Sequence, residues 1–188
     1  MALSRRTFIK TGIIGGGLLA IAGLASKDTV WGGGTTHQTP TGEPLKFLTR
    51  KDYQVLATIA SILLSGAISQ EPESRKQQID TTLRELDKAL IVLQPTAQKE
   101  LRQLLGLLKI PITRILAARV TSSWENASPE AINSFLMRWR NSNTALFRTA
   151  YSGLHQLIMG AWYGQEQAWS SIGYPGPPLQ KILTGAHR

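Results

Sequence analysis

Apolar residues at helical intervals recur through most of this chain, and this pattern constrains its fold more than any other feature. Steps of three and four residues place side chains on one face of an α-helix. No segment shows sustained alternation with a period of two, which is the pattern of a half-buried strand. The sequence therefore predicts an all-α fold, a compact bundle of five or six helices with short connections. The clearest stripes are Ile79, Leu83, Leu86, Leu90 and Leu93; Leu101, Leu104, Leu105 and Leu108; and Ile132, Phe135, Leu136 and Trp139.

Capping residues mark where several of these helices begin and end. Thr49 with Asp52 resembles a capping box in which Asp replaces Glu, and a helix over 53–64 follows it. Gly66 is placed to end that helix, because glycine adopts the left-handed conformation of a C-terminal cap.

Prolines divide the rest of the bundle. Pro95 suits the first turn of one helix, and Ser128 before Pro129 suits the N-cap of another. Pro111 interrupts the chain, after which the aliphatic residues of 112–120 indicate a short helix. A final helix is expected over 144–162, with one apolar face formed by Phe147, Ala150, Tyr151, Leu154, Leu157 and Ile158.

The N-terminus carries an export motif. Its residues follow the twin-arginine (Tat) consensus S-R-R-x-F-I-K, through Ser4, Arg5, Arg6, Phe8, Ile9 and Lys10. The apolar run that follows, 11–25, covers only ~22 Å as a helix, short of the ~30 Å hydrocarbon core of a bilayer. We therefore expect residues 1–26 to be a Tat signal peptide and the protein to be periplasmic. Cleavage stays open, and an uncleaved signal would tether the chain to the inner membrane.

Two further segments differ from the helical domain expected over 45–163. Residues 27–44 are rich in Gly, Thr and Pro and predict a flexible linker. Residues 164–188 form a Pro/Gly-rich tail, in which the prolines and glycines from Gly173 onward oppose a helix. The aromatic part of this tail either packs on its own bundle or binds a partner, and the candidate partner-binding residues are Trp169, Ile172, Tyr174, Pro175 and Pro177.

Composition excludes several kinds of chemistry. The chain contains no cysteine, so it forms no disulfide, thiolate zinc site or iron–sulfur site. Its net charge of +9 comes from scattered Lys and Arg. This predicts either a solvated basic surface or a patch for an acidic partner or anionic lipid headgroups. We expect no nucleic-acid binding, because no recognition motif is present.

Catalytic and metal-ligating groupings are not evident in the sequence. His37, His155 and His187 lie far apart, and a metal site needs clustered ligands. Glu85 and Asp87 fall on different faces of one helix, so they do not form an acid–base pair. We therefore expect no catalytic, cofactor-binding or metal-binding residue, and no enzymatic activity of the chain by itself.

The C-terminal half resembles a known family. The resemblance rests on Trp139-Arg140-Asn141-Ser142, Phe147-Arg148, Leu154, Trp162-Tyr163, Trp169 and the ending Ile172-Gly173-Tyr174-Pro175-Gly176-Pro177. This pattern looks like the gluconate 2-dehydrogenase subunit 3 family, whose members also open with a Tat signal followed by a helix start like Leu48-Thr49. The G-Y-P-G-P ending is its most specific part.

The resemblance implies a role within an oxidoreductase complex. Members of that family are small subunits of dehydrogenases that oxidise sugars, polyols or sugar acids. The large subunit resembles glucose–methanol–choline (GMC) oxidoreductases and carries FAD, and a cytochrome c subunit often accepts the electrons. The large subunit often lacks a signal, so this chain is expected to be its non-catalytic escort through the Tat translocase. The alternative is a free-standing exported helical binding module with another partner.

Overall fold

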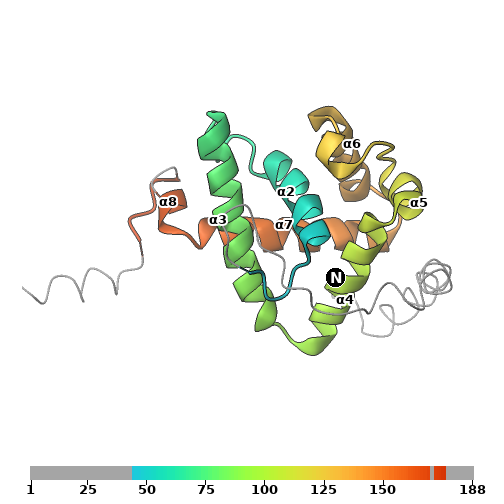
Figure 1. Cartoon of the computed structure of the whole chain (residues 1–188), viewed down its shortest axis with the longest axis horizontal. Coiled ribbons are helices and arrows are strands. Elements are labelled where there is room, and N and C mark those ends of the chain that lie inside the picture. Colours follow the sequence, from blue (N-terminus) through green and yellow to red (C-terminus); the bar gives the residue numbers. More distant parts are fainter. Residues whose placement is uncertain (1–43, 170–171, 177–188) are drawn as a thin grey trace, which may run out of the picture.

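The computed structural model describes residues 44–169 and 172–176 of the chain. This part is 73% helical and contains no strand, which confirms the predicted all-α bundle (Figure 1). The predicted Tat signal, the linker up to residue 43, and Pro177 lie outside the described residues.

Five helices of 12 to 20 residues form the bundle. They are α2 (Arg50–Leu63), α3 (Pro72–Ile91), α4 (Pro95–Lys109), α6 (Pro129–Arg140) and α7 (Ala145–Tyr163). Four shorter elements join or extend them: α5 (Pro111–Thr113), the π-helical turn η1 (Arg114–Ala118), the 3₁₀ turn η2 (Trp124–Asn126) and α8 (Glu166–Trp169).

The helix ends form as the capping residues predicted. The Thr49 side chain accepts a hydrogen bond from the Asp52 backbone N–H at 3.2 Å, and Asp52 Oδ2 accepts one from the Thr49 backbone N–H at 2.9 Å. This reciprocal capping box begins α2. Ser128 caps α6 through the Ala131 N–H, and Gly66 takes the predicted left-handed conformation, with φ +89°.

Helix α2 lies at the centre of the bundle and contacts α3, α4, η2, α6 and α7. Helix α7 crosses behind α3 and α2 (Figure 1) and packs mainly against α3 and α6. The predicted apolar stripes face this centre, and the largest fully buried side chains include Leu56, Ile59, Leu83, Phe135 and Trp162.

An aromatic row fixes the segment between α4 and α6. The rings of Trp124, Phe135, Trp139 and Phe147 succeed one another at centroid distances of 5.7, 4.7 and 5.2 Å. The Trp124 Nε1–H donates to the Leu108 carbonyl at 2.8 Å, and the Trp139 Nε1–H donates to the Ala117 carbonyl at 2.9 Å. The two indoles thus bury their apolar rings and still satisfy their donors.

The short helix predicted after Pro111 exists, but most of its aliphatic residues do not enter the core. It consists of the single turn α5 continued by the π-turn η1, and Arg119 ends it with φ 54°. Val120 is buried, whereas 69% of Ile112 and 72% of Leu116 are exposed. The sequence spacing identified a helix there, and the outward direction of its apolar face comes from tertiary packing.

Candidate functional site

The described residues among those predicted to bind a partner, which are Trp169, Ile172, Tyr174 and Pro175, lie in or beside a compact turn after α7. The Trp169 Nε1–H donates to the Tyr163 carbonyl at 2.9 Å, and the Tyr174 backbone N–H donates to the Trp169 carbonyl at 2.9 Å. The Trp169 and Tyr174 rings meet edge to face at a centroid distance of 5.5 Å. Gly173 allows the reversal, because its φ of +66° is strained for other residues. We call Tyr163, Trp169, Ile172 and Tyr174 the aromatic turn.

The aromatic turn is half packed and half presented to solvent. Ala168 is buried and Trp169 is half-buried, so the chain folds this segment onto the end of its own bundle. In contrast, 55% of Ile172 and 43% of Tyr174 are exposed, and Pro175 is exposed too. Packing on the chain's own bundle therefore describes part of the segment. Partner binding by these residues stays a prediction.

The short helix α8 belongs to this turn. The glycines and prolines from Gly173 onward were expected to oppose a helix, and α8 ends before them, at Trp169. The Ala168 backbone N–H donates to the Gln165 carbonyl, and the Gln165 side chain donates to the Ala161 carbonyl at 2.8 Å and to Thr82 Oγ1 at 3.2 Å. Gln165 thereby ties the start of the turn to α3.

A groove of about 320 Å³ lies between α3 and α7 and extends to Gly164 and Gln165, which precede α8. Its walls are largely small or aliphatic, and Gly164 and Gln165 close the end from which α8 begins. Apart from its own stretch of helix, no described atom lies within 4 Å of where a Cβ would stand at Gly160, so this glycine leaves room for another chain to approach the α7 backbone. The groove is lined by Glu85, Leu86, Ala89, Gln156, Leu157, Gly160, Ala161, Gly164 and Gln165.

A second, polar cleft of about 250 Å³ flanks α3 on the side of α8. It is lined by Ser74, Gln77, Gln78 and Thr81 of α3 and by Gln167 of α8. The side of α3 toward α8 is thus hydrophilic, whereas the groove beside α7 is mainly apolar.

Among the described residues, three buried aspartates hold the bundle together. The sequence predicted the capping role of Asp52, but not its ion pair or the contacts of Asp80 and Asp87. Asp87 accepts hydrogen bonds from the backbone N–H groups of Lys46, Phe47 and Leu48 at 2.7, 3.0 and 2.7 Å. Asp52 belongs to the capping box and also forms an ion pair with Lys109 of α4 at 2.8 Å. These contacts fasten the segment that leads into α2, and α2 itself, to α3 and α4.

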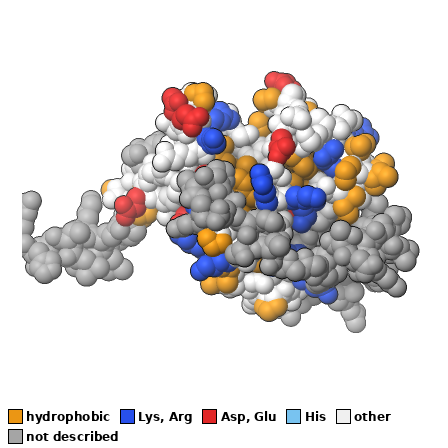
Figure 2. All heavy atoms as spheres, in the orientation of Figure 1, with side chains coloured by type: hydrophobic (Ala, Val, Ile, Leu, Met, Phe, Trp, Pro, Cys, Tyr) orange, Lys and Arg blue, Asp and Glu red, His pale blue; other side chains and the backbone are white. Residues whose placement is uncertain are grey.

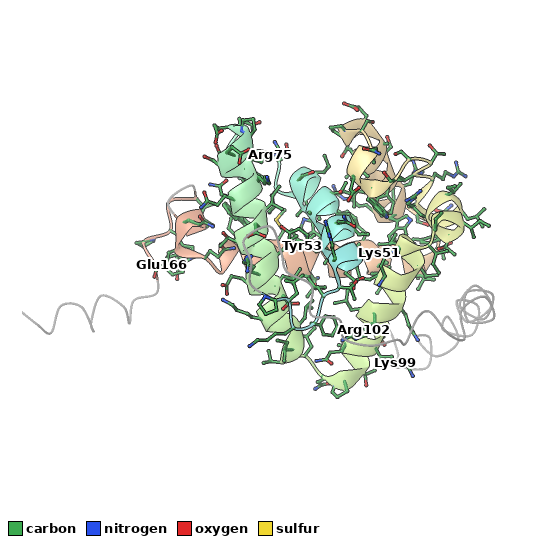
Figure 3. All side chains as sticks on the ribbon, in the orientation of Figure 1. Lys51, Tyr53, Arg75, Lys99, Arg102 and Glu166 are labelled. Atoms are coloured by element: carbon green, nitrogen blue, oxygen red, sulfur yellow. The ribbon has the colours of Figure 1, made fainter. Side chains whose placement is uncertain are left out.

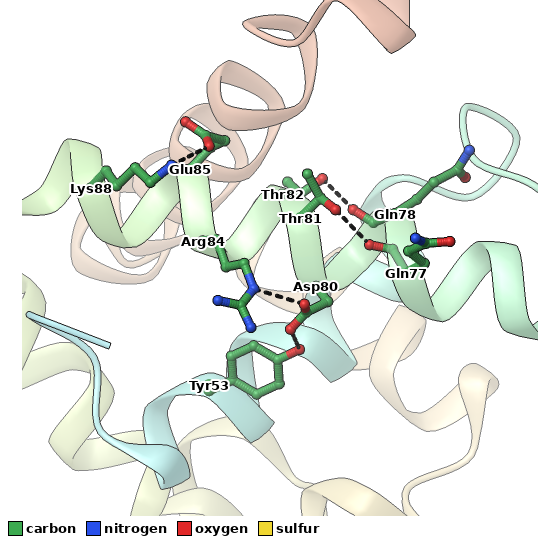
Figure 4. Close-up of polar contacts among 9 residues, drawn as sticks. All are labelled: Tyr53, Gln77, Gln78, Asp80, Thr81, Thr82, Arg84, Glu85 and Lys88. Atoms are coloured by element: carbon green, nitrogen blue, oxygen red, sulfur yellow. Dashed lines mark hydrogen bonds and ion pairs between the residues drawn. The ribbon is translucent and has the colours of Figure 1, made fainter. Parts of the chain in front are cut away.

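The third aspartate links α2 to α3. Asp80 accepts a hydrogen bond from the Tyr53 hydroxyl at 2.7 Å and pairs with Arg84 Nε at 2.8 Å (Figure 4). Burial, followed by the hydrogen bond to Asp80, raises the pKa of Tyr53 well above its usual value. The Asp80 carboxylate is thus engaged by two donors, which is the pattern of a structural buried charge.

The sequence signal that could have identified Asp80 and Asp87 as buried is their position next to apolar residues. Asp80 and Asp87 each follow a stripe residue of α3, Ile79 and Leu86, so they sit at the edge of the buried face. Exposed Glu85, by contrast, pairs with Lys88 at 2.7 Å on the solvent side. The expectation that Glu85 and Asp87 occupy different faces is confirmed.

Basic residues gather on the side formed by α2 and α4. Figure 3 shows Lys51 on α2 and Lys99 and Arg102 on α4, away from Glu166 of α8. The Arg102 guanidinium stacks 4.0 Å above the Phe47 ring, which shields that buried ring and leaves the charge near the surface.

Within residues 44–169 and 172–176, no three His, Asp or Glu side chains are grouped to hold a metal ion. Over the same ranges, no helix combines the length and apolar character needed to cross a bilayer.

No protein-family model, curated protein or solved structure matches this chain. The assignment to the gluconate 2-dehydrogenase subunit 3 family therefore stays a prediction based on the quoted motifs.

Proposed function

We propose that this chain is a non-catalytic small subunit and export escort of an FAD-dependent dehydrogenase in the periplasm or at the inner membrane. The sequence supports export through its Tat motif, in which Arg5 and Arg6 would engage the translocase. The C-terminal motif, ending Tyr174-Pro175-Gly176-Pro177, supports the dehydrogenase class, which acts on sugars, polyols or sugar acids.

The observation that carries the escort role is the aromatic turn at the end of α7. Ile172 and Tyr174 project from a turn that hydrogen bonds and ring packing hold in place. Preorganised aromatic and aliphatic side chains suit interface anchors, because little entropy is lost when a partner covers them. The groove adds a mainly apolar surface, and its lining residues Gly164 and Gln165 directly follow Tyr163 of the aromatic turn in the chain.

In this proposal the large subunit holds the FAD and performs the oxidation. This chain supplies the signal and a binding surface, so the two subunits fold together in the cytoplasm and cross the membrane as one folded unit. A cytochrome c subunit would then accept the electrons on the far side.

The decisive experiment separates escort from independent export. Arg5→Lys combined with Arg6→Lys in the full chain should leave both this protein and the flavoprotein large subunit in the cytoplasm. Immunoblots and flavin fluorescence of periplasmic and cytoplasmic fractions measure this. The matched control is Arg50→Lys with Arg75→Lys, which makes the same substitutions in the helical domain and should leave export unchanged.

Two outcomes would count against the proposal. Normal export of the large subunit in the leader variant would show that it does not travel with this chain. Retention of this chain alone, with no flavoprotein affected, would favour the free-standing exported binding module.

A further inference from the structure

A cluster of exposed aliphatic side chains lies on α5 and η1, at the opposite end of the molecule from α8 (Figure 1). Ile112, Ile115 and Leu116 are exposed by 69%, 41% and 72%. We call these three residues the aliphatic tip. Figure 2 shows hydrophobic side chains gathered over this end of the bundle, with Lys and Arg side chains beside them.

Hydrogen bonds hold the backbone next to the aliphatic tip in place. The Trp139 indole donates to the Ala117 carbonyl, and the Arg138 guanidinium donates to the Ala118 carbonyl at 2.5 Å. At the other end of the tip, Thr113 Oγ1 donates to the Leu107 carbonyl. These contacts hold the backbone of the turn in place. The three aliphatic side chains are therefore exposed as part of the folded structure.

The stretch of sequence that contains the aliphatic tip carries charge of one sign. From residue 101 to residue 124 the sequence contains no Asp or Glu, but it contains Arg102, Lys109, Arg114 and Arg119. Lys109 is paired with Asp52. Among the described residues, no carboxylate lies within ion-pair distance of Arg114 or Arg119.

Arg138 of α6 adds to this charge. Partial burial, together with the neighbouring Arg119 charge, lowers the pKa of Arg138. Arg138 therefore adds a second positive charge near Arg119, since its guanidinium donates to the carbonyl of the neighbouring Ala118. An anion beside these two arginines would relieve their repulsion.

We propose that the aliphatic tip and its arginines form a docking site for an anionic lipid surface. Ile112 and Leu116 would enter the boundary between headgroups and acyl chains, and Arg114, Arg119 and Arg138 would meet the lipid phosphates. Apolar side chains flanked by basic ones bind membranes through this combination of apolar burial and electrostatic attraction.

The shape and composition of the aliphatic tip favour a lipid surface over a protein partner. It consists of two short turns at one end of the molecule, whereas a stable protein interface covers about 800 Å² per partner. Its three residues are all aliphatic, whereas protein interfaces are enriched in aromatic residues and Met. The aromatic turn, at the other end of the molecule, has the composition suited to a protein partner. The lipid proposal does not depend on the proposed dehydrogenase role.

A fluorescent probe on the aliphatic tip tests the proposal in the full chain. Because the sequence has no cysteine, Leu116→Cys provides a unique attachment point for an environment-sensitive dye. The control is Val92→Cys at the turn between α3 and α4, where the side chain is 83% exposed. Both chains carry the same leader, so membrane binding through the leader affects both.

The dye at position 116 should shift to shorter wavelength with phosphatidylcholine vesicles containing phosphatidylglycerol, and brominated lipid should quench it. The dye at position 92 should change little. Adding Arg119→Gln should raise the lipid concentration for half-maximal shift about fivefold, because one basic residue near an anionic surface contributes about that factor. Lys51→Gln removes the same charge from α2 and should change it less than twofold.

Several results would overturn the proposal. One is an unshifted dye at position 116 with anionic vesicles, and another is an equal shift at positions 92 and 116. Equal effects of Arg119→Gln and Lys51→Gln would refute the assigned role of the arginines. A shift without lipid that grows with protein concentration would assign the aliphatic tip to a second copy of the chain.

Discussion

Asp87→Asn tests the buried contact that fastens the start of the domain to α3. The carboxylate is 3% exposed, and its two oxygens accept three backbone N–H groups, from Lys46, Phe47 and Leu48. Hydrogen bonds to a charged group contribute about 1.5–3 kcal/mol each. Asparagine keeps one carbonyl oxygen but turns an NH₂ group toward the remaining backbone N–H. It therefore loses at least one bond and weakens the others by removing the charge.

The expected loss is about 3 kcal/mol in the free energy of unfolding, which lowers Tm by roughly 10 °C for a domain of this size. Urea unfolding followed by circular dichroism measures the loss. Hydrogen exchange should also accelerate at the amides of residues 46–48. The control is Glu85→Gln, which removes an exposed charge from the same helix and should cost less than about 0.5 kcal/mol. A loss below about 1 kcal/mol for Asp87→Asn, with residues 46–48 still protected, would refute the anchoring role.

Three further predictions concern other parts of the structure. Replacing Trp169 and Tyr174 with Ala should weaken large-subunit binding in co-purification and leave helix content by circular dichroism unchanged. Unchanged co-purification would contradict partner binding by the aromatic turn. Trp124→Phe should lower stability by about 1–3 kcal/mol in urea unfolding, because the α4 carbonyl loses its donor and the core loses volume. The raised pKa of Tyr53 means that the unfolded chain ionises first, at about pH 10, so stability should fall as pH rises above that value. Tyr53→Phe should reduce this alkaline loss in unfolding measured across that pH range, and an unchanged pH profile would contradict the assignment.

The long helices could be predicted because their signals are local. The stripe Leu83–Leu86–Leu90 and the Thr49–Asp52 capping box each specify structure within a few residues. The structure confirms these features because tertiary packing reinforces the same local preferences.

Features that depend on distant residues were not predictable. Asp87 is charged and suggests a solvent position, yet its partners lie 39 to 41 residues earlier in the chain. Ile112 and Leu116 have the spacing of a core stripe, but no described element packs over them. Whether an apolar face is buried depends on the arrangement of the other helices, which the stripe itself does not encode.

In the candidate site, too, the local features could be predicted from the sequence and those formed by distant residues could not. The tail composition singled out Trp169, Ile172, Tyr174 and Pro175, and the structure places them in or beside one turn. The adjacent groove joins Leu86 of α3 to Gly160 of α7, and residues so far apart give no joint signal in a single sequence. The groove forms only through the packing of α3 on α7.

The most direct test of the escort role is a pull-down of the tagged chain at its native expression level, with absorbance and mass spectrometry of the eluate. The proposal predicts a yellow eluate with the absorbance of bound flavin and a large oxidoreductase chain. A colourless eluate that contains this chain alone would contradict it.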